Sequence, residues 1–245
     1  MQASKLSRLE KGRTVPSEND VQLLTRVYRA TPEQHRRLLE MAQDVKAENR
    51  RVVFNRDPGG FQDRIGRIEE ASTSARSFSP NVIPGLLQSA AYARTLMRSA
   101  GWSSEITDQA VAGRMNRQRR LDEEDSPRRF VIITTDGGLG WSAGAPNMMI
   151  EQLERIAART YRPNVRVGIV PFGRPAEVFP LHSWELFDQR AVIVGTTTAT
   201  AVLTEPRDVA VYAELTDALE RLAVYGAEAR EILTRVADRY RSLDT

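Results

Sequence analysis

The sequence predicts an α+β (or α/β) protein with two domains, an all-helical one over residues 1–48 and a larger mixed α/β one over residues 57–245. Up to residue 45, apolar side chains recur at the three- and four-residue spacing of amphipathic helices. Beyond residue 57, short apolar runs alternate with helical runs, which is typical of a sheet layered with helices rather than of a helix bundle. The polar stretch from Lys46 to Arg51 separates the two patterns and is predicted to be the linker.

The composition is that of an ordinary globular chain of 245 residues, with 41% hydrophobic residues, 27% charged residues and a net charge of +3. The absence of cysteine excludes disulfides and thiolate metal sites, and it fits a reducing cytoplasm. No apolar run approaches the ~18 residues of a membrane span, and the N-terminus lacks the apolar core of a signal peptide. We therefore expect a cytoplasmic protein with no membrane partner, no cofactor and no metal.

The first helix is expected from Ala3 to Lys11, with Leu6 and Leu9 on one side and Gly12 as its C-cap. Its other positions carry mainly small or cationic residues. Such residues suit a helix that enters the DNA major groove, because a bulky apolar side chain would block the approach. Cations just past the base-reading turn are placed for phosphates.

The stretch from Ala3 to Ser17 resembles the recognition helix of the Xre/Cro-type helix-turn-helix family, whose pattern is S-x-S-x-(L/I)-S-R-(L/I)-E-x-G-(R/K)-x-x-P-S. The resemblance implies a transcriptional regulator that binds double-stranded DNA, with Glu10 in an internal contact. It also implies base contacts from the helix start and the next turn, and backbone contacts from the flanking cations. The residues so implied are Ala3, Ser4, Lys5, Ser7, Arg8, Lys11 and Arg13.

Members of that family carry two more helices before this point. The resemblance therefore implies a partial helix-turn-helix domain over residues 1–48, whose first two helices are missing. An isolated helix of this length is marginal in water, so we expect DNA binding once those helices are restored. The alternative is an ordinary amphipathic surface helix.

Two further helices are expected before the linker. Ser17 is a good N-cap for the first, and Thr31 to Gln34 forms a capping box with proline at N1 for the second. His35 is expected to be a solvated polar residue. The predicted apolar stripes consist of Val21, Leu24, Val27 and Tyr28, and of Leu38, Leu39, Ala42 and Val45.

The second domain begins with a short helix predicted by Phe61, Ile65 and Ile68, followed by an extended segment through Phe78. Helical and strand-like runs then follow. The helices are predicted over 86–99, 106–121, 148–158, 209–222 and 227–243, and the strands over 130–135, 165–172, 183–187, 191–195 and 200–203.

The run from Ser79 to Met97 contains a backbone break at Pro84 and Gly85, followed by a helix. It resembles a block, (E/S)-P-x-x-(V/I)-P-G-L-L-Q-x-x-x-Y-A-R-x-L, of actinobacterial regulators with a C-terminal domain of unknown function (DUF5753-type). The resemblance implies a homodimer whose C-terminal domain binds a protein partner or a small ligand, with a small acidic protein encoded nearby as the favoured partner. The block itself is either a packed corner braced by Tyr92 and Arg94, which we favour, or a ligand site.

The helix over 106–121 presents a dense set of cations that includes Arg114, Arg117, Arg119 and Arg120. Such a set can contact phosphate, but four acidic residues from Asp122 onward follow it directly. We therefore expect a solvated or self-paired helix.

No catalytic pattern is present in the sequence. Its histidines are His35 and His182, it lacks P-loop and zinc-protease motifs, and Gly137 to Gly140 predicts a loop. The order of elements around His182 is similar to one half of phospholipase-D-like folds, but Trp184 and Gln189 replace the Lys and Asp of the active H-x-K-x-x-x-x-D pattern. We expect no enzyme and, if that likeness holds, a binding surface lined by His182 and Trp184.

These observations together predict a DNA-binding transcriptional regulator, in which a dimer presents two recognition helices at half-sites about 34 Å apart. A signal received by the C-terminal domain would change their spacing or availability. The candidate residues for that signal are Tyr92, Arg94, His182 and Trp184. The alternative is an enzyme, or a degenerate phospholipase-D-like binding domain without DNA-binding activity in a truncated chain.

Overall fold

The computed structural model describes residues 3–11, 14, 16–55, 66, 68–123, 127–196 and 200–243, without the side chains of Ala3 and of residues 44–55. It divides the chain into two compact units, Met1–Val53 and Phe54–Thr245. The first is helical and the second combines helices with a mixed sheet, so the predicted fold class is confirmed. Phe61, Ile65 and most of the short helix predicted around them lie outside the described residues.

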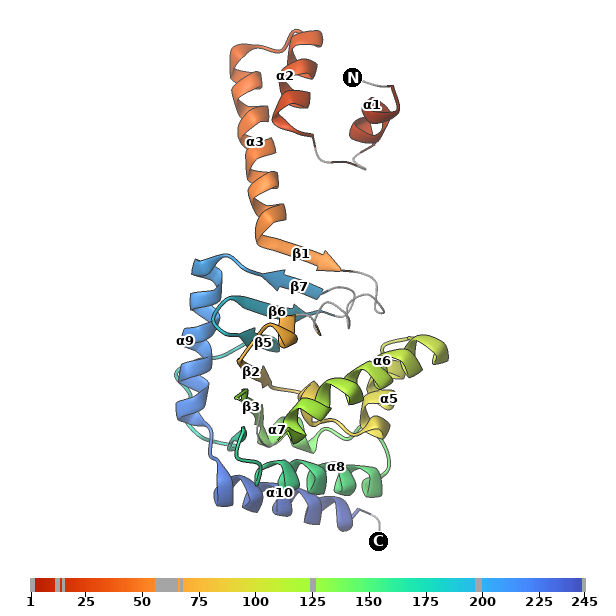
Figure 1. Ribbon diagram of the computed structural model, residues 1–245, viewed down its shortest axis with the longest axis vertical. Helices are drawn as coiled ribbons and strands as arrows, with labels where there is room; N and C mark the ends of the chain where they lie inside the picture. The colour runs from red at the N-terminus through yellow and green to blue at the C-terminus, as the bar shows by residue number, and fades with distance from the viewer. Residues whose placement is uncertain are drawn as a thin grey trace. The chain divides into compact units, whose positions relative to one another are not determined.

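The N-terminal unit contains α1 (Ala3–Glu10), α2 (Glu18–Val27) and α3 (Pro32–Arg51) (Figure 1). Ser17 caps α2 as predicted, and its capping box is completed by the Asp20 side chain. The predicted box before α3 is confirmed too: the Thr31 amide donates to Gln34 Oε1 at 2.9 Å, and the Gln34 amide donates to Thr31 Oγ1 at 3.2 Å. These reciprocal bonds satisfy amide groups that a helix start otherwise leaves unpaired.

The structure adds to or differs from three predictions for this unit. The backbone from Lys46 to Arg51, predicted to be the linker, is helical and continues α3. Leu38, predicted to be buried, is 44% exposed, whereas Ala42, one turn further along α3, is buried. His35 is only half-exposed, and its Nδ1 lies 2.7 Å from the hydroxyl of Thr25 on α2.

The second unit is built on a mixed sheet whose strands follow the order β1-β7-β6-β5-β2-β3-β4. Strands β2, β3 and β4 are parallel, whereas β5, β6 and β7 are antiparallel to their neighbours. The strand β1 (Val52–Asn55) spans the boundary between the two units. The others are β2 (Ser74–Ser79), β3 (Arg129–Thr135), β4 (Val165–Val170), β5 (Trp184–Phe187), β6 (Ala191–Gly195) and β7 (Thr200–Leu203).

Helices and 3-10 turns surround this sheet. They are η1 (Gly85–Leu87), α5 (Ala90–Ser99), α6 (Ser104–Gln118), η2 (Arg119–Asp122), α7 (Asp136–Gly140), α8 (Pro146–Arg159), α9 (Pro206–Leu222) and α10 (Gly226–Arg241). Within the described residues, no helix is long and apolar enough to span a lipid bilayer.

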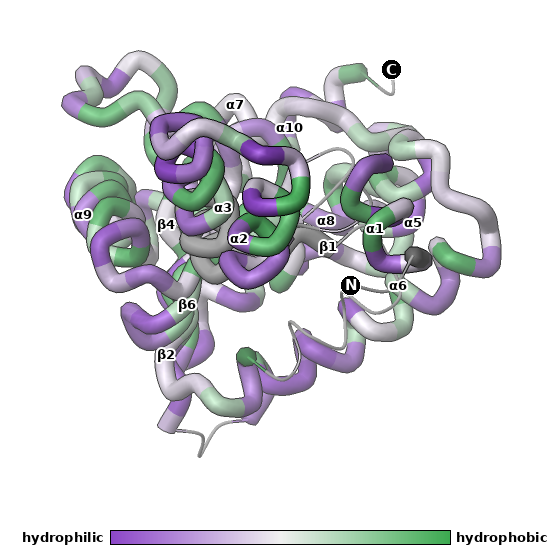
Figure 2. Tube along the Cα trace, turned by 90° about the horizontal axis from the view of Figure 1, so that it is seen from above, coloured by the Kyte–Doolittle hydropathy of each residue, from purple (hydrophilic) through white to green (hydrophobic). Residues whose placement is uncertain are grey.

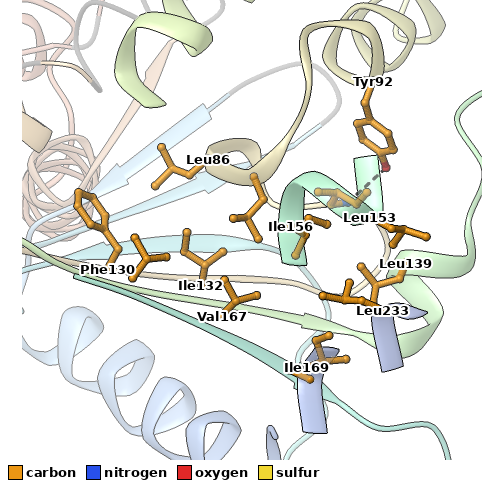
Figure 3. Close-up of a cluster of buried hydrophobic side chains, with 14 of the residues drawn as sticks. Leu86, Tyr92, Phe130, Ile132, Leu139, Leu153, Ile156, Val167, Ile169 and Leu233 are labelled. Carbon is orange, nitrogen blue, oxygen red and sulfur yellow. Dashed lines mark hydrogen bonds between the residues drawn. The ribbon is translucent and has the colours of Figure 1, made fainter. Parts of the chain in front are cut away.

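Each face of the sheet has its own apolar core, because side chains alternate along a strand. The larger core joins β3 and β4 to η1, α5, α8 and α10, and Figure 3 shows Leu86, Phe130, Ile132 and Ile156 in it. The other core joins Phe78 and Trp184 to α9, whose hydrophobic and hydrophilic residues alternate around its turns (Figure 2).

Two predicted elements differ from the structure. The run predicted as one helix over 86–99 is divided into η1 and α5, because Gln88 is extended and Ser89 caps a new helix. The glycine cluster predicted as a loop forms the short helix α7, since Thr135 Oγ1 accepts the amide of Gly138 at 2.9 Å.

Candidate functional site

The first candidate site is the exposed side of α1. Ser4, Arg8 and Lys11 are exposed and spaced by four and three residues, so they follow one side of the helix. Leu6 and Leu9 are half-buried, which matches the predicted division between an apolar and a polar side. A hydroxyl and two long cations in a row can contact base edges and phosphates.

Lys5 has a different place from the other cations of α1. Its ammonium lies 2.6 Å from Asp20 Oδ1, and Asp20 is buried on α2. The same carboxylate accepts bonds from the amide and the hydroxyl of Ser17 at 3.0 and 2.6 Å. The hydrogen bonds from Lys5 and then from Ser17 lower the pKa of Asp20 from 3.8 to about 2. Lys5 therefore ties α1 to the start of α2.

The other residues of the predicted DNA contact are either partly buried or not fully described by the structure. Ser7 is half-buried, the side chain of Ala3 is not described, and Arg13 lies outside the described residues. Glu10, implied to make an internal contact, accepts a long hydrogen bond of 3.5 Å from the Tyr28 hydroxyl. The structure thus places Ser4, Arg8 and Lys11 together on one exposed side and leaves the rest of the prediction untested.

The predicted signal residues do not form one site. Tyr92 is buried in the larger core, where its hydroxyl accepts the amide of Ile83 at 3.2 Å (Figure 3). This bond braces the corner after β2. Arg94 pairs with Asp108 and thereby joins α5 to α6 at the surface.

His182 and Trp184 belong to the other face of the sheet. His182 Nε2 lies 2.8 Å from the hydroxyl of Tyr212 on α9, and the indole of Trp184 donates to Thr216 Oγ1 at 3.0 Å. Trp184 is buried, so of this pair His182 alone is accessible at the surface. The three rings pack edge to face and join β5 to α9.

A cavity of about 210 Å³ also lies in the second unit, on the face of the sheet that carries the larger core, and Trp184 is the predicted signal residue that contributes to its lining. Its lining combines apolar side chains with a set of charged and polar ones that includes Ser77, Gln88, Arg114, Arg117 and Glu185. The prediction of a solvated or self-paired α6 is therefore wrong for Arg114 and Arg117. Arg117 is 6% exposed, although Arg119 is exposed and Arg120 pairs with Glu69 and Glu70.

The sequence carries one signal for this cavity, which is the spacing of two arginines along α6. Arg114 and Arg117 continue the spacing of the buried residues Ala110 and Val111 along α6. A cation on the buried stripe of a helix requires a polar surrounding, because a charge is costly to bury without one. In the part of the chain that the structure describes, no group of histidine and acidic side chains is arranged to hold a metal ion.

Comparisons with known proteins agree with the division into two units. Residues 1–38 match the family described as a helix-turn-helix domain, which indicates a DNA-binding regulator. Residues 62–235 match the family described as a domain of unknown function, DUF5753. A comparison with curated proteins found no match.

Solved structures show only distant similarity. Nuc from Salmonella typhimurium, a phospholipase D family member, is 13% identical with a TM-score of 0.39, over 71% of this chain and 95% of that chain. TrmBL2, an archaeal chromatin protein, is 11% identical with a TM-score of 0.39, over 85% of this chain and 69% of that chain. Both similarities are too distant to indicate a function. The family is shown by the longer match: this chain belongs to the DUF5753 family and carries helix-turn-helix sequence at its N-terminus.

Proposed function

We propose that this protein is an Xre-type transcriptional regulator of the actinobacterial DUF5753 group and not an enzyme. Its N-terminal unit reads DNA, and its C-terminal unit forms a homodimer and receives a signal from a protein partner or a small ligand. The observation that carries the proposal is the row of Ser4, Arg8 and Lys11 on the exposed side of a helix inside the helix-turn-helix match.

The residues of this row would make two kinds of contact with DNA, to base edges and to phosphates. Arg8 is long enough to reach a guanine edge with its two-pronged guanidinium, and Ser4 allows the helix to approach the bases closely. Lys11, after the last turn, neutralises a phosphate and adds affinity without sequence preference. Lys5 acts indirectly, because its ion pair with Asp20 fixes α1 against α2.

The proposal is tested by measuring DNA binding over a series of salt concentrations with the promoter region beside the gene and with random DNA. The chain is compared with a form extended upstream in the same reading frame. Arg8→Ala is expected to cost about 1–3 kcal/mol on the specific site and to relax sequence preference. Lys11→Ala is expected to weaken binding to all sequences and to reduce the salt slope by about one.

Arg36→Ala serves as the control, because Arg36 is an exposed arginine on α3 and is absent from the row on α1. It should leave the preference for the promoter unchanged. If neither form binds the promoter more tightly than random DNA, the proposed function is wrong. Equal losses from Arg8→Ala and Arg36→Ala would instead show that α1 is not the reading helix.

A further inference from the structure

Hydrogen bonds between side-chain amides and the backbone fix part of the wall of this cavity in the second unit. Gln88 Nε2 donates to the Ile83 carbonyl at 2.6 Å, and Gln118 Nε2 donates to the carbonyls of Gly85 and Gln88 at 2.9 and 2.8 Å. Gln88 and Gln118 are both buried. Gln88 also accepts a hydrogen bond from Arg114, which fixes this guanidinium at the wall. Side chains that are fixed by such hydrogen bonds are preorganised for a ligand.

Two guanidinium groups of α6 have unused donors in this wall. Arg114 Nε, and Arg117 Nε and Nη1, are buried and make no hydrogen bond with any residue that the structure describes. Arg117 Nη1 lies 3.4 Å from Glu69 Oε1 in an ion pair without a hydrogen bond, so among the described residues Nε is the donor of Arg117 that has neither kind of contact. Burial lowers the pKa of Arg114 to about 10, so the group is still charged at neutral pH. Buried donors without acceptors are rare in folded proteins and call for a partner.

The sheet supplies a matching acceptor on the floor of the cavity. Glu185 on β5 lies opposite Ser77 on β2 and opposite Ile193 on β6, so the three side chains share one face. Glu185 Oε2 and Ser77 Oγ are buried and have no hydrogen-bond partner among the described residues. The carboxylate is near enough to Arg114 to act on its pKa. The cavity therefore offers two cationic donors from α6 and a carboxylate and a hydroxyl from the sheet.

The charges and the volume define the ligand that fits. Two guanidinium groups suit a carboxylate, which they can bind through parallel hydrogen bonds. The nearby carboxylate of Glu185 disfavours a doubly charged phosphate and favours a ligand whose other end is an ammonium group. A volume of about 210 Å³ is below the roughly 300–1,000 Å³ of pockets for drug-sized ligands, which favours a smaller molecule.

We propose that this cavity binds a small zwitterionic carboxylic acid of amino-acid size, with its carboxylate on Arg114 and Arg117 and its ammonium on Glu185. The inference rests on the proposed role of the C-terminal unit as the receiver of a signal. It does not rest on DNA binding.

The test is calorimetric titration of the whole chain with each of the common amino acids and with inorganic phosphate, in the absence of DNA. The amino acid that binds best is then compared with its amine, which lacks the carboxylate, and with its acid, which lacks the amino group. Saturable binding of an amino acid, with much weaker binding of both analogues, is expected. Absence of saturable binding at millimolar concentration of every amino acid, or tighter binding of phosphate, would overturn the proposal.

Variants of the cavity test which residue binds the carboxylate of the ligand and which binds its ammonium group. Arg114→Gln should weaken the binding of the amino acid and of its deaminated acid by about tenfold or more. Glu185→Gln should weaken the amino acid to a similar extent but leave the deaminated acid almost unchanged. Arg119→Gln removes the same charge from an exposed position close by and should change neither. Circular dichroism and thermal unfolding confirm that each variant is folded.

Equal effects of Glu185→Gln on the amino acid and on its deaminated acid, or no effect of either cavity variant, would place the ligand elsewhere and overturn the inference. The outcome is separable from that of the DNA assay. Amino-acid binding without DNA binding would contradict the proposed function alone, and DNA binding without amino-acid binding would contradict this inference alone.

Discussion

At the scale of single residues, the ion pair of Lys5 and Asp20 determines how the N-terminal unit responds to acid. The pKa of Asp20 is about 2 in the folded unit and 3.8 in the reference state, so folding favours the charged carboxylate. Its stabilisation is therefore complete above pH 3.8 and is lost as the pH falls through about 2. Lys5 is 40% exposed, so solvent screening reduces the value of the pair to about 1–2 kcal/mol.

Asp20→Asn is expected to lower the free energy of unfolding of this unit by that amount at neutral pH, and the difference from the unchanged protein should shrink toward pH 2. Chemical denaturation followed by helix content measures both proteins over this range, and carboxyl NMR titration measures the pKa of Asp20. Glu40→Gln, at an exposed position of α3, is the control and should have little effect. A carboxyl of Asp20 that titrates near 3.8 would contradict this account.

At the scale of elements, local sequence predicts most of the second unit and fails where burial depends on distant partners. The strands β6 and β7 span the same residues that their apolar runs predicted. Their signal is local, because side chains covered on both faces leave a continuous apolar run. The burial of Arg117 instead depends on Glu69, which lies 48 positions earlier in the chain (117 minus 69). The cavity could not be assembled from the sequence because α6, β2 and β5 meet there only in the fold.

The short helix α7 shows the same dependence and yields a prediction. A Cβ atom on Gly138 would lie 2.8 Å from the Pro80 carbonyl oxygen and 3.0 Å from Thr134 Oγ1. The Pro80 carbonyl is part of the backbone and cannot easily move aside. Gly138→Ala should therefore destabilise the second unit by about 2 kcal/mol. Gly140→Ala, in the same helix, meets no atom within 4 Å and should change stability by less than about 0.5 kcal/mol. Urea denaturation of both variants measures the contrast, and equal effects would show that α7 does not pack against Pro80 in solution.

At the scale of the whole molecule, the two units are stabilised by different interactions. The described part of the N-terminal unit buries few large apolar side chains, with Val21 and Ala42 among its buried residues, and it relies on capping boxes and the Lys5–Asp20 pair. The second unit has two extensive cores on the faces of one sheet. A small unit with little apolar burial is marginally stable, whereas the larger one buries a greater fraction of its surface.

This difference predicts two thermal transitions in scanning calorimetry of the full chain, with the N-terminal unit unfolding first. Asp20→Asn should lower only the first transition, and Gly138→Ala should lower only the second, by roughly 4–8 °C for the 2 kcal/mol expected. An amino acid that occupies the cavity should raise only the second, because a ligand stabilises the unit that binds it. A single transition that all three changes shift together would show that the units unfold cooperatively. In that case ligand binding in the cavity would stabilise the DNA-reading helices directly, and DNA affinity measured with and without the amino acid would show the coupling as a change in binding constant.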